Sequence, residues 1–127
     1  MVSQFVRYLA KWLIKEDVMS KPLTVIATYR VKKGEEDAFR GHLAKHWPTL
    51  REHNLATDEP PLIFRGEDEG AEPFYVEVFA WRDQAAVDTA HQLPEVMAIW
   101  EPMGKHCADR GGRPSMEFPH VERVELH

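Results

Sequence analysis

Two histidines, a tryptophan and the only cysteine of the chain lie within residues 90–107, whose sequence is AHQLPEVMAIWEPMGKHC. Imidazole and thiolate groups act as bases, nucleophiles and metal ligands, so this segment is the first candidate for a catalytic or metal site. The helical period separates these groups, because Trp100 and Cys107 share an apolar stripe whereas His106 projects from another side. We therefore expect Trp100 and Cys107 to pack in the core, with Cys107 unreactive, and no metal between His106 and Cys107.

This region is divided into two helical pieces at Leu93 and Pro94, because proline favours the first turn of a helix. His91 follows Val87 by four residues on the first piece, so its side chain is expected to face the sheet. Histidine suits the role of a general base because its ordinary pKa is about 6.5. His91 is therefore the first candidate for a catalytic base, and a buried histidine bonded to the backbone is the alternative.

A second pair of histidines, His42 and His46, lies on the segment HLAKH. Residues at positions i and i+4 of a helix can chelate a metal, but the glutamate that follows the first histidine in the zinc-protease motif is missing. A position at the boundary of the apolar helix face accounts for both side chains. His46, which lies nearer to Phe39, is the second candidate for an acid or base, at the edge of a cavity.

The elements that must position these side chains have strand and helix patterns in turn. Alternating side chains and β-branched residues predict four strands, over residues 23–31, 61–66, 74–81 and 115–126. Helical spacing begins at Glu35, and a second helical region follows the N-cap candidate Asp83. The order βαββαβ is that of a ferredoxin-like α+β fold, in which helices cover one face of a four-stranded antiparallel sheet. The other face needs cover, and a second copy of the chain would supply it.

The composition limits the domain organisation and the partners. A chain of 127 residues fits one core domain, here residues 21–127. The 16 basic and 21 acidic residues give no positive field, so nucleic acid is not expected as a partner. A single cysteine cannot form an internal disulfide, which fits a reducing compartment, and we expect the cytoplasm.

Residues 1–20 are expected to form an N-terminal extension to this domain. Apolar residues at helical spacing, with Arg7, Lys11 and Lys15 on the opposite side, predict an amphipathic helix. The same charges interrupt the apolar run, which argues against a membrane span or a signal peptide. We expect the helix to pack on its own domain or on a partner, and contact of residues 1–18 with an anionic membrane is the alternative. The sequence MSKPLTV, from residue 19, also has the form of a natural chain start.

Two segments carry a family resemblance. The runs LTVIATYRVKKGEEDAFRGHL and EVFAWRDQAAVDTAHQLPEVMAIW resemble the antibiotic biosynthesis monooxygenase family of small dimeric α+β barrel proteins. The resemblance covers roughly residues 22–125 and implies a homodimer formed through the sheet face. It leaves the activity open, because the family includes cofactor-independent oxygenases of quinols and aromatic polyketides, haem-degrading oxygenases and proteins without an assigned activity.

The haem-degrading members of the family use an asparagine, a tryptophan and a histidine around the haem. The resemblance places Ala27 at the asparagine position, and His91 and Trp100 at the tryptophan and histidine positions. The iron-binding histidine is thus missing from its place. A haem-binding or haem-degrading protein is therefore the least favoured alternative, and no cofactor or metal is expected.

The resemblance favours a monooxygenase that acts on a small aromatic or quinol-type substrate without metal, flavin or haem. Such a site needs an apolar cavity, a base and hydrogen-bond donors. We expect His91 to act as the base, and Tyr29, which shares a strand face with Ala27, to hold a substrate oxygen. Trp100, Ala27 and Trp81 are the candidates for the wall, although packing is the simpler role for Trp81. The alternative is a non-catalytic small-molecule-binding or assembly module of the same fold.

Overall fold

The computed structural model describes residues 21–127, so the helix expected in residues 1–20 lies outside the described part of the chain. The sheet is antiparallel, with the strand order β2-β3-β1-β4, and a short fifth strand also pairs with β1. The strands are β1 (Leu23–Arg30), β2 (Leu62–Asp68), β3 (Glu72–Trp81), β4 (Met116–Glu117) and β5 (His120–Val121).

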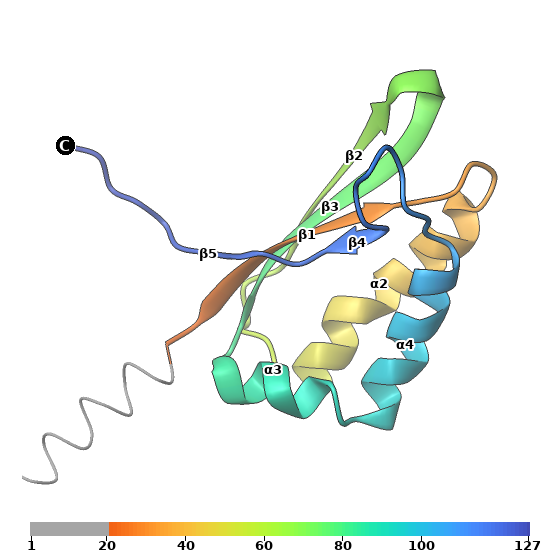
Figure 1. The fold of residues 1–127 in the computed structure, drawn as a ribbon. Helices are drawn as coiled ribbons and strands as arrows, with labels where there is room; N and C mark the ends of the chain where they lie inside the picture. Colours follow the sequence, from red (N-terminus) through yellow and green to blue (C-terminus); the bar gives the residue numbers. More distant parts are fainter. Residues whose placement is uncertain (1–20) are drawn as a thin grey trace, which may run out of the picture.

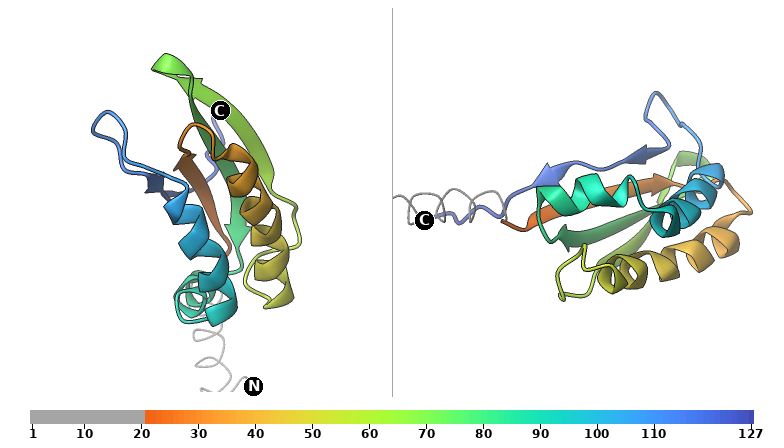
Figure 2. Two further views of the ribbon diagram at one scale, coloured as in Figure 1. Left: turned by 90° about the vertical axis from the view of Figure 1, so that its right-hand side faces the viewer. Right: turned by 90° about the horizontal axis from the view of Figure 1, so that it is seen from below.

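Helices cover one face of this sheet, as the views in Figure 1 and Figure 2 show. They are α2 (Glu36–Glu52), α3 (Gln84–Ala90) and α4 (Pro94–Lys105), and a 3-10 turn, η1 (Glu69–Ala71), joins β2 to β3. Helices α2 and α4 lie side by side (Figure 2). The order confirms the ferredoxin-like βαββαβ arrangement, with α3 and α4 together in place of the second helix. Within residues 21–127, no helix has the length and apolar character needed to cross a membrane.

The helices begin where the sequence predicts. Helix α2 carries Glu36 and Asp37 in its first turn, where the helix dipole favours negative charge. Helix α4 has Pro94 in its first turn, where a missing backbone N–H costs no intrahelical hydrogen bond. Leu93 before it is extended, so the break between α3 and α4 falls at the predicted position.

Helix α3 is capped by Asp83, whose side chain accepts a hydrogen bond of 2.8 Å from the backbone N–H of Ala86. The side chain of Arg82 also donates to this carboxylate, and that contact holds the pKa of Asp83 below its ordinary value. A carboxylate whose pKa is lower in the folded state than in the unfolded state stabilises the fold most at a pH above its own pKa in the unfolded chain.

Replacing Asp83 with alanine is therefore expected to lower the free energy of unfolding by about 1 kcal/mol at pH 7. The unfolded pKa of aspartate is about 3.9. The difference in the free energy of unfolding between the wild type and the variant should shrink as the pH falls from this unfolded-state pKa through the lower pKa of Asp83 in the folded protein. Urea denaturation at pH 7 and pH 3 measures it, with Asp88→Ala on the same helix as the control. A difference that did not change with pH would contradict this account.

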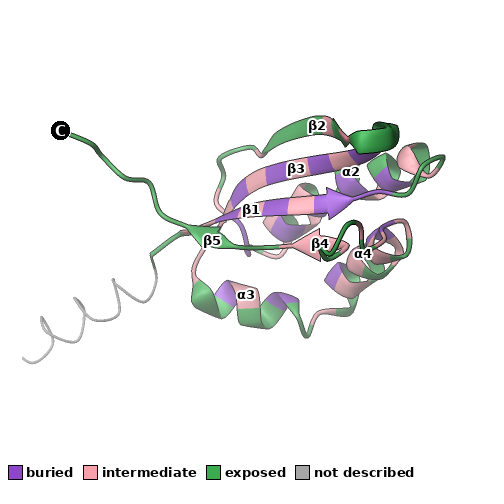
Figure 3. Cartoon of the chain, turned by 45° about the horizontal axis from the view of Figure 1, so that its top comes forward, coloured by how far each residue is buried: buried purple, intermediate pink, exposed green. Residues whose placement is uncertain are grey.

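The core lies between the sheet and the helices. Strand β3 alternates along its whole length, as the purple and pink bands of Figure 3 show, and its buried set faces the helices. That set includes Tyr75, Phe79 and Trp81, and it meets the buried Phe39 and Leu50 of α2. One set of side chains from each strand thus forms the floor on which the helices pack.

The opposite face of the sheet is apolar and open. Leu62 and Phe64 of β2 pair with Val78 and Val76 of β3. The side chain of Leu62 is 60% exposed, and that of Phe64 is 56% exposed. Large apolar side chains that are exposed together are typical of an interaction surface. We call Leu62, Phe64, Val76 and Val78 the open face.

The last strand is shorter than the prediction of residues 115–126. Only the two-residue strands β4 and β5 form, and the chain between them contains Pro119, which has no N–H to donate to a ladder. The carbonyl of Pro119 still accepts a hydrogen bond from the backbone N–H of Ile26, so this segment stays against β1. Residues 122–127 form no strand and run away from the domain (Figure 1).

Candidate active site

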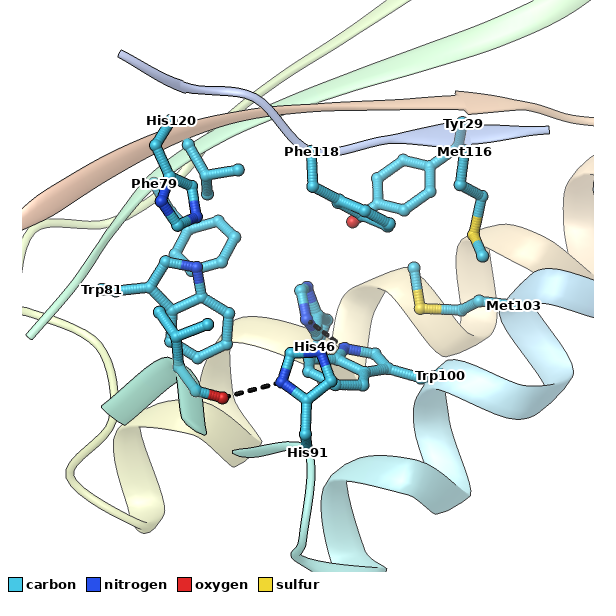
Figure 4. A pocket seen from close by; sticks show the side chains of 12 residues that line it. Tyr29, His46, Phe79, Trp81, His91, Trp100, Met103, Met116, Phe118 and His120 are labelled. Atoms are coloured by element: carbon cyan, nitrogen blue, oxygen red, sulfur yellow. Dashed lines mark hydrogen bonds between the residues drawn. The ribbon is translucent and has the colours of Figure 1, made fainter. Parts of the chain in front are cut away.

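A cavity of about 320 Å³ lies between the sheet, helices α3 and α4, and the C-terminal segment (Figure 4). Most of its wall is aromatic or aliphatic, with polar side chains at separate points. The lining residues are Val25, Tyr29, His46, Phe79, Trp81, Val87, His91, Trp100, Met103, Met116, Phe118 and His120. A cavity with an apolar wall and a few polar groups is the usual form of a small-molecule site.

The imidazole of His46 is buried and has partners on both nitrogens. Nε2 lies 2.9 Å from the indole Nε1 of Trp100, and Nδ1 lies 2.9 Å from Oε1 of Glu77. An indole N–H can only donate, so Nε2 of His46 is the acceptor and the ring proton sits on Nδ1. The ring is therefore neutral in this arrangement and donates to Glu77. Sequence reasoning expected His46 at the edge of a cavity, and the structure places its buried ring in the wall of this cavity.

Glu77 is one of the residues of this site that the sequence analysis missed. Its carboxylate is fully buried and accepts hydrogen bonds from the Tyr29 hydroxyl, at 2.8 Å, and from His46. Ala27 lies directly opposite Glu77 in the pairing of β1 and β3. The strand alternation carried the signal, because the period of two puts Glu77 in the same set as the apolar side chains that face the helices. A charged residue in such a set needs a partner.

The Tyr29 ring forms part of the cavity wall, and its hydroxyl proton is directed to Glu77. Burial, and then the nearby Glu77 carboxylate, raise the pKa of Tyr29 well above its ordinary value, so the hydroxyl stays protonated. Its role as a donor to a substrate oxygen remains a prediction, because that role would require the bond to Glu77 to break. Ala27 lies in the core beside Tyr29 and outside the cavity lining.

His91 stands at the end of α3, exposed on one side and bordering the cavity on the other (Figure 4). Its Nδ1 lies 2.8 Å from the carbonyl oxygen of Val87. A carbonyl can only accept, so Nδ1 carries a proton and Nε2 of the neutral ring has a lone pair. In the described part of the chain, no hydrogen bond is made to this Nε2. The ring also packs edge-on against Trp100, at a centroid distance of 5.0 Å.

Trp100 and Trp81 meet in the wall of the cavity, with their ring centroids 6.3 Å apart. The structure thus brings five of the six candidate residues, His46, His91, Tyr29, Trp81 and Trp100, around one cavity. Met116, Phe118 and His120 also line it, and sequence reasoning did not select them. They are alternate residues of the C-terminal segment, and Met116 and His120 pair with Tyr29 and Val25 of β1, so the strand period of two turns them toward the cavity.

The remaining reactive groups lie apart from the cavity. Nδ1 of His106 lies 2.9 Å from Oε1 of Glu35. The ring of His106 stacks on that of His42, at a centroid distance of 5.6 Å. Cys107 is buried, which confirms the prediction, and desolvation raises the pKa of its thiol to about 11. Such a thiol is not a nucleophile at neutral pH. In residues 21–127, no three His, Cys, Asp or Glu side chains are grouped to hold a metal ion.

Comparisons with known proteins agree on the fold. No family model and no curated protein matches the sequence. Among solved structures, SnoaB, a cofactor-independent oxygenase from Streptomyces nogalater, has a TM-score of 0.59 and 12% identity, and the match covers 83% of this chain and 95% of SnoaB. A structure named antibiotic biosynthesis monooxygenase has a TM-score of 0.60 and 18% identity, over 81% of this chain and 99% of its own.

Rv0793 from Mycobacterium tuberculosis is similar too, with a TM-score of 0.58 and 13% identity over 84% of this chain and 98% of Rv0793. Nearly the whole length of each of these proteins matches, whereas the identities are low. The chain therefore has the α+β fold of the antibiotic biosynthesis monooxygenases, which confirms the sequence resemblance at the level of the fold.

Proposed function

We propose that the chain is a cofactor-independent monooxygenase that binds a small aromatic or quinol-type substrate in the cavity. The observation that carries this proposal is His91, whose Nε2 lone pair lies at the border of an apolar cavity while Nδ1 is held by the Val87 carbonyl. A base must be within reach of the proton that it takes, and a fixed ring presents its free nitrogen in one direction. The named oxygenases of the same fold support the proposal.

The chemistry balances without a cofactor. His91 takes the proton of a substrate hydroxyl, and the electron-rich phenolate then reduces molecular oxygen. For a hydroquinone, the sum is hydroquinone plus O₂ to hydroxyquinone plus water. One oxygen atom enters a C–H bond of the ring, the other leaves as water, and the substrate supplies all four electrons. The apolar wall contributes by keeping water away from the reactive intermediate.

Oxygen uptake with a panel of hydroquinones, in the presence of a metal chelator, tests this function. We expect His91→Ala to lower kcat by about 100-fold or more, because a positioned general base contributes at least that much. His53→Ala, a histidine outside the cavity lining, is the matched control and should keep the wild-type rate. Equal rates for wild type and His91→Ala would overturn the proposal. Binding of the panel without oxygen uptake would instead favour the non-catalytic binding module.

We propose further that a second copy of the chain covers the open face. Support comes from the exposure of Leu62 and Phe64, which a homodimer formed through the sheet would remove from water. Burial of apolar surface is the main favourable contribution to such an interface.

Phe64→Glu is expected to convert this dimer to a monomer, because it would bury a carboxylate in an apolar interface. Ile63→Glu is the matched control, since Ile63 is the next residue of the same strand, is 46% exposed, and belongs to the other face of the sheet. Sedimentation equilibrium of the full chain measures both variants. A monomeric wild type, or the same mass for both variants, would rule out dimerisation through the open face.

A further inference from the structure

We propose that the buried side of the cavity holds a second proton acceptor, Nε2 of His46, with Glu77 as its positioning residue. The inference rests on the proposed function and narrows the substrate to an aromatic compound with two hydroxyl groups. One hydroxyl would donate to His91 where the cavity opens, and the other to His46 inside. These two hydroxyl protons are the two that the departing oxygen atom needs to become water, so the reaction stays balanced.

The orientation of His46 is set by its two hydrogen bonds. Glu77 accepts from Nδ1, at 2.9 Å from Oε1 and 3.1 Å from Oε2, and so keeps the proton on that nitrogen. The lone pair of Nε2 then points away from Glu77, toward Trp100 in the cavity wall. This is the arrangement in which an imidazole can take a proton on one side while a carboxylate stabilises the charge from the other.

Glu77 has no cationic partner among the described residues. Its hydrogen bonds come from the hydroxyl of Tyr29 and from Nδ1 of His46. A buried charge with neutral donors only is costly, and a proton on His46 would turn the contact into an ion pair. Transfer of a proton from a substrate hydroxyl to Nε2 would therefore place opposite charges side by side.

The indole of Trp100 occupies the place that the substrate hydroxyl would take. Its N–H donates to the lone pair of His46, which is what a phenolic hydroxyl would do. Trp100 is only partly buried and contacts both His46 and His91, at centroid distances of 6.3 Å and 5.0 Å. A ligand hydroxyl that reached Nε2 of His46 would therefore have to displace the indole N–H of Trp100.

The test uses 4-nitrophenol, whose phenolate is yellow and whose neutral form is not. At a pH where the free dye is mainly neutral, the wild type is expected to bind it as the phenolate. His46→Gln should bind the dye mainly in its neutral form. Glu77→Gln should lower the ratio of ionised to neutral bound dye by about 10-fold or more, because a neighbouring charge shifts such equilibria by that amount. His91→Ala should lower this ratio less than His46→Gln does, because only His46 has the Glu77 carboxylate behind it.

Glu77→Gln guards against a folding artefact, because both short hydrogen bonds end on Oε1 and an amide oxygen can accept both. His42→Gln, one turn earlier on α2 and outside the cavity lining, is the matched control and should behave as the wild type. Loss of ionisation in His91→Ala alone, or neutral bound dye in the wild type, would overturn the role of His46 and leave the proposed function standing. Failure of every variant and the wild type to bind the dye would count against both proposals.

Nitrogen chemical shifts of the imidazole give a readout that does not depend on ligand. In the full-length wild type at neutral pH, His46 is expected to show a protonated Nδ1 and an unprotonated Nε2. Trp100→Phe removes the donor to Nε2 while it keeps an aromatic wall, and the proton should stay on Nδ1 because Glu77 still accepts from that nitrogen. A proton on Nε2 in the neutral wild-type ring would overturn the assignment.

Discussion

Replacing Glu77 with alanine is expected to lower the free energy of unfolding by about 3–5 kcal/mol. The substitution removes the acceptor of two buried hydrogen bonds, so the Tyr29 hydroxyl and the Nδ1–H of His46 lose their partner where water cannot replace it. Each unsatisfied buried donor costs about 1–3 kcal/mol, and the missing side-chain volume adds to that cost. Urea denaturation followed by tryptophan fluorescence measures the change.

Two other variants separate the hydrogen bonds of Glu77 from its charge. Glu77→Gln keeps an acceptor for both donors, so we expect it to cost only about 1 kcal/mol. Glu101→Ala, an exposed residue of α4, should stay within about 0.5 kcal/mol of the wild type. If Glu77→Ala cost no more than Glu101→Ala, the network around His46 would contribute nothing to the fold.

The strands and helices followed from local patterns. The strands predicted over residues 23–31 and 74–81 correspond to Leu23–Arg30 and Glu72–Trp81 in the structure. They could be predicted because side-chain alternation can be recognised within a single strand. Asp83 and Pro94 fixed the starts of α3 and α4 for the same reason, since capping acts over a single turn. The predicted length of the last strand was wrong, because that length depends on pairing with β1, which lies far away in the sequence.

The site could be predicted only in part. His91, Tyr29, Trp81 and Trp100 each belong to a face whose direction the period gives, and the structure places all four around one cavity. The environment of His46 was not predictable in this way. Trp100 is 54 residues from His46 along the chain, and Glu77 is 31 residues away, so the network exists only once α2, α4 and β3 are packed together.

The arrangement also explains how a carboxylate can lie close to an apolar cavity. Glu77 lies behind the wall and not in it, since His46 and Tyr29 stand between its carboxylate and the cavity. The wall itself is then aromatic, which suits the stacking of a planar ligand. Under our proposal, the charge acts through His46 and stays out of contact with the substrate. Its effect on a bound phenol is therefore a measurable property of one hydrogen-bonded pair.

Phe39→Ala is expected to lower the free energy of unfolding by about 3–5 kcal/mol, which is the range for truncating a buried phenylalanine. Phe39 is fully buried on α2, and its ring lies between those of Tyr29 and Tyr75, at centroid distances of 5.2 Å and 5.3 Å. Denaturant midpoints measured for the full-length protein give the change, provided that the denaturant dependence of the free energy stays constant.

Phe118→Ala is the matched control, because its ring also contacts Tyr29, at 5.8 Å, but is 50% exposed. We expect it to cost about 1 kcal/mol, since half of its apolar area already meets water. The comparison tests how much stability the contact of Tyr29 with α2 contributes and how much its contact with the C-terminal segment contributes. Equal losses of stability for the two variants would contradict this account, because they would mean that the exposure of Phe118 does not limit its contribution. A larger loss for Phe39→Ala would show that the packing of α2 against the sheet contributes more of the stability around the Tyr29 ring than the C-terminal segment does.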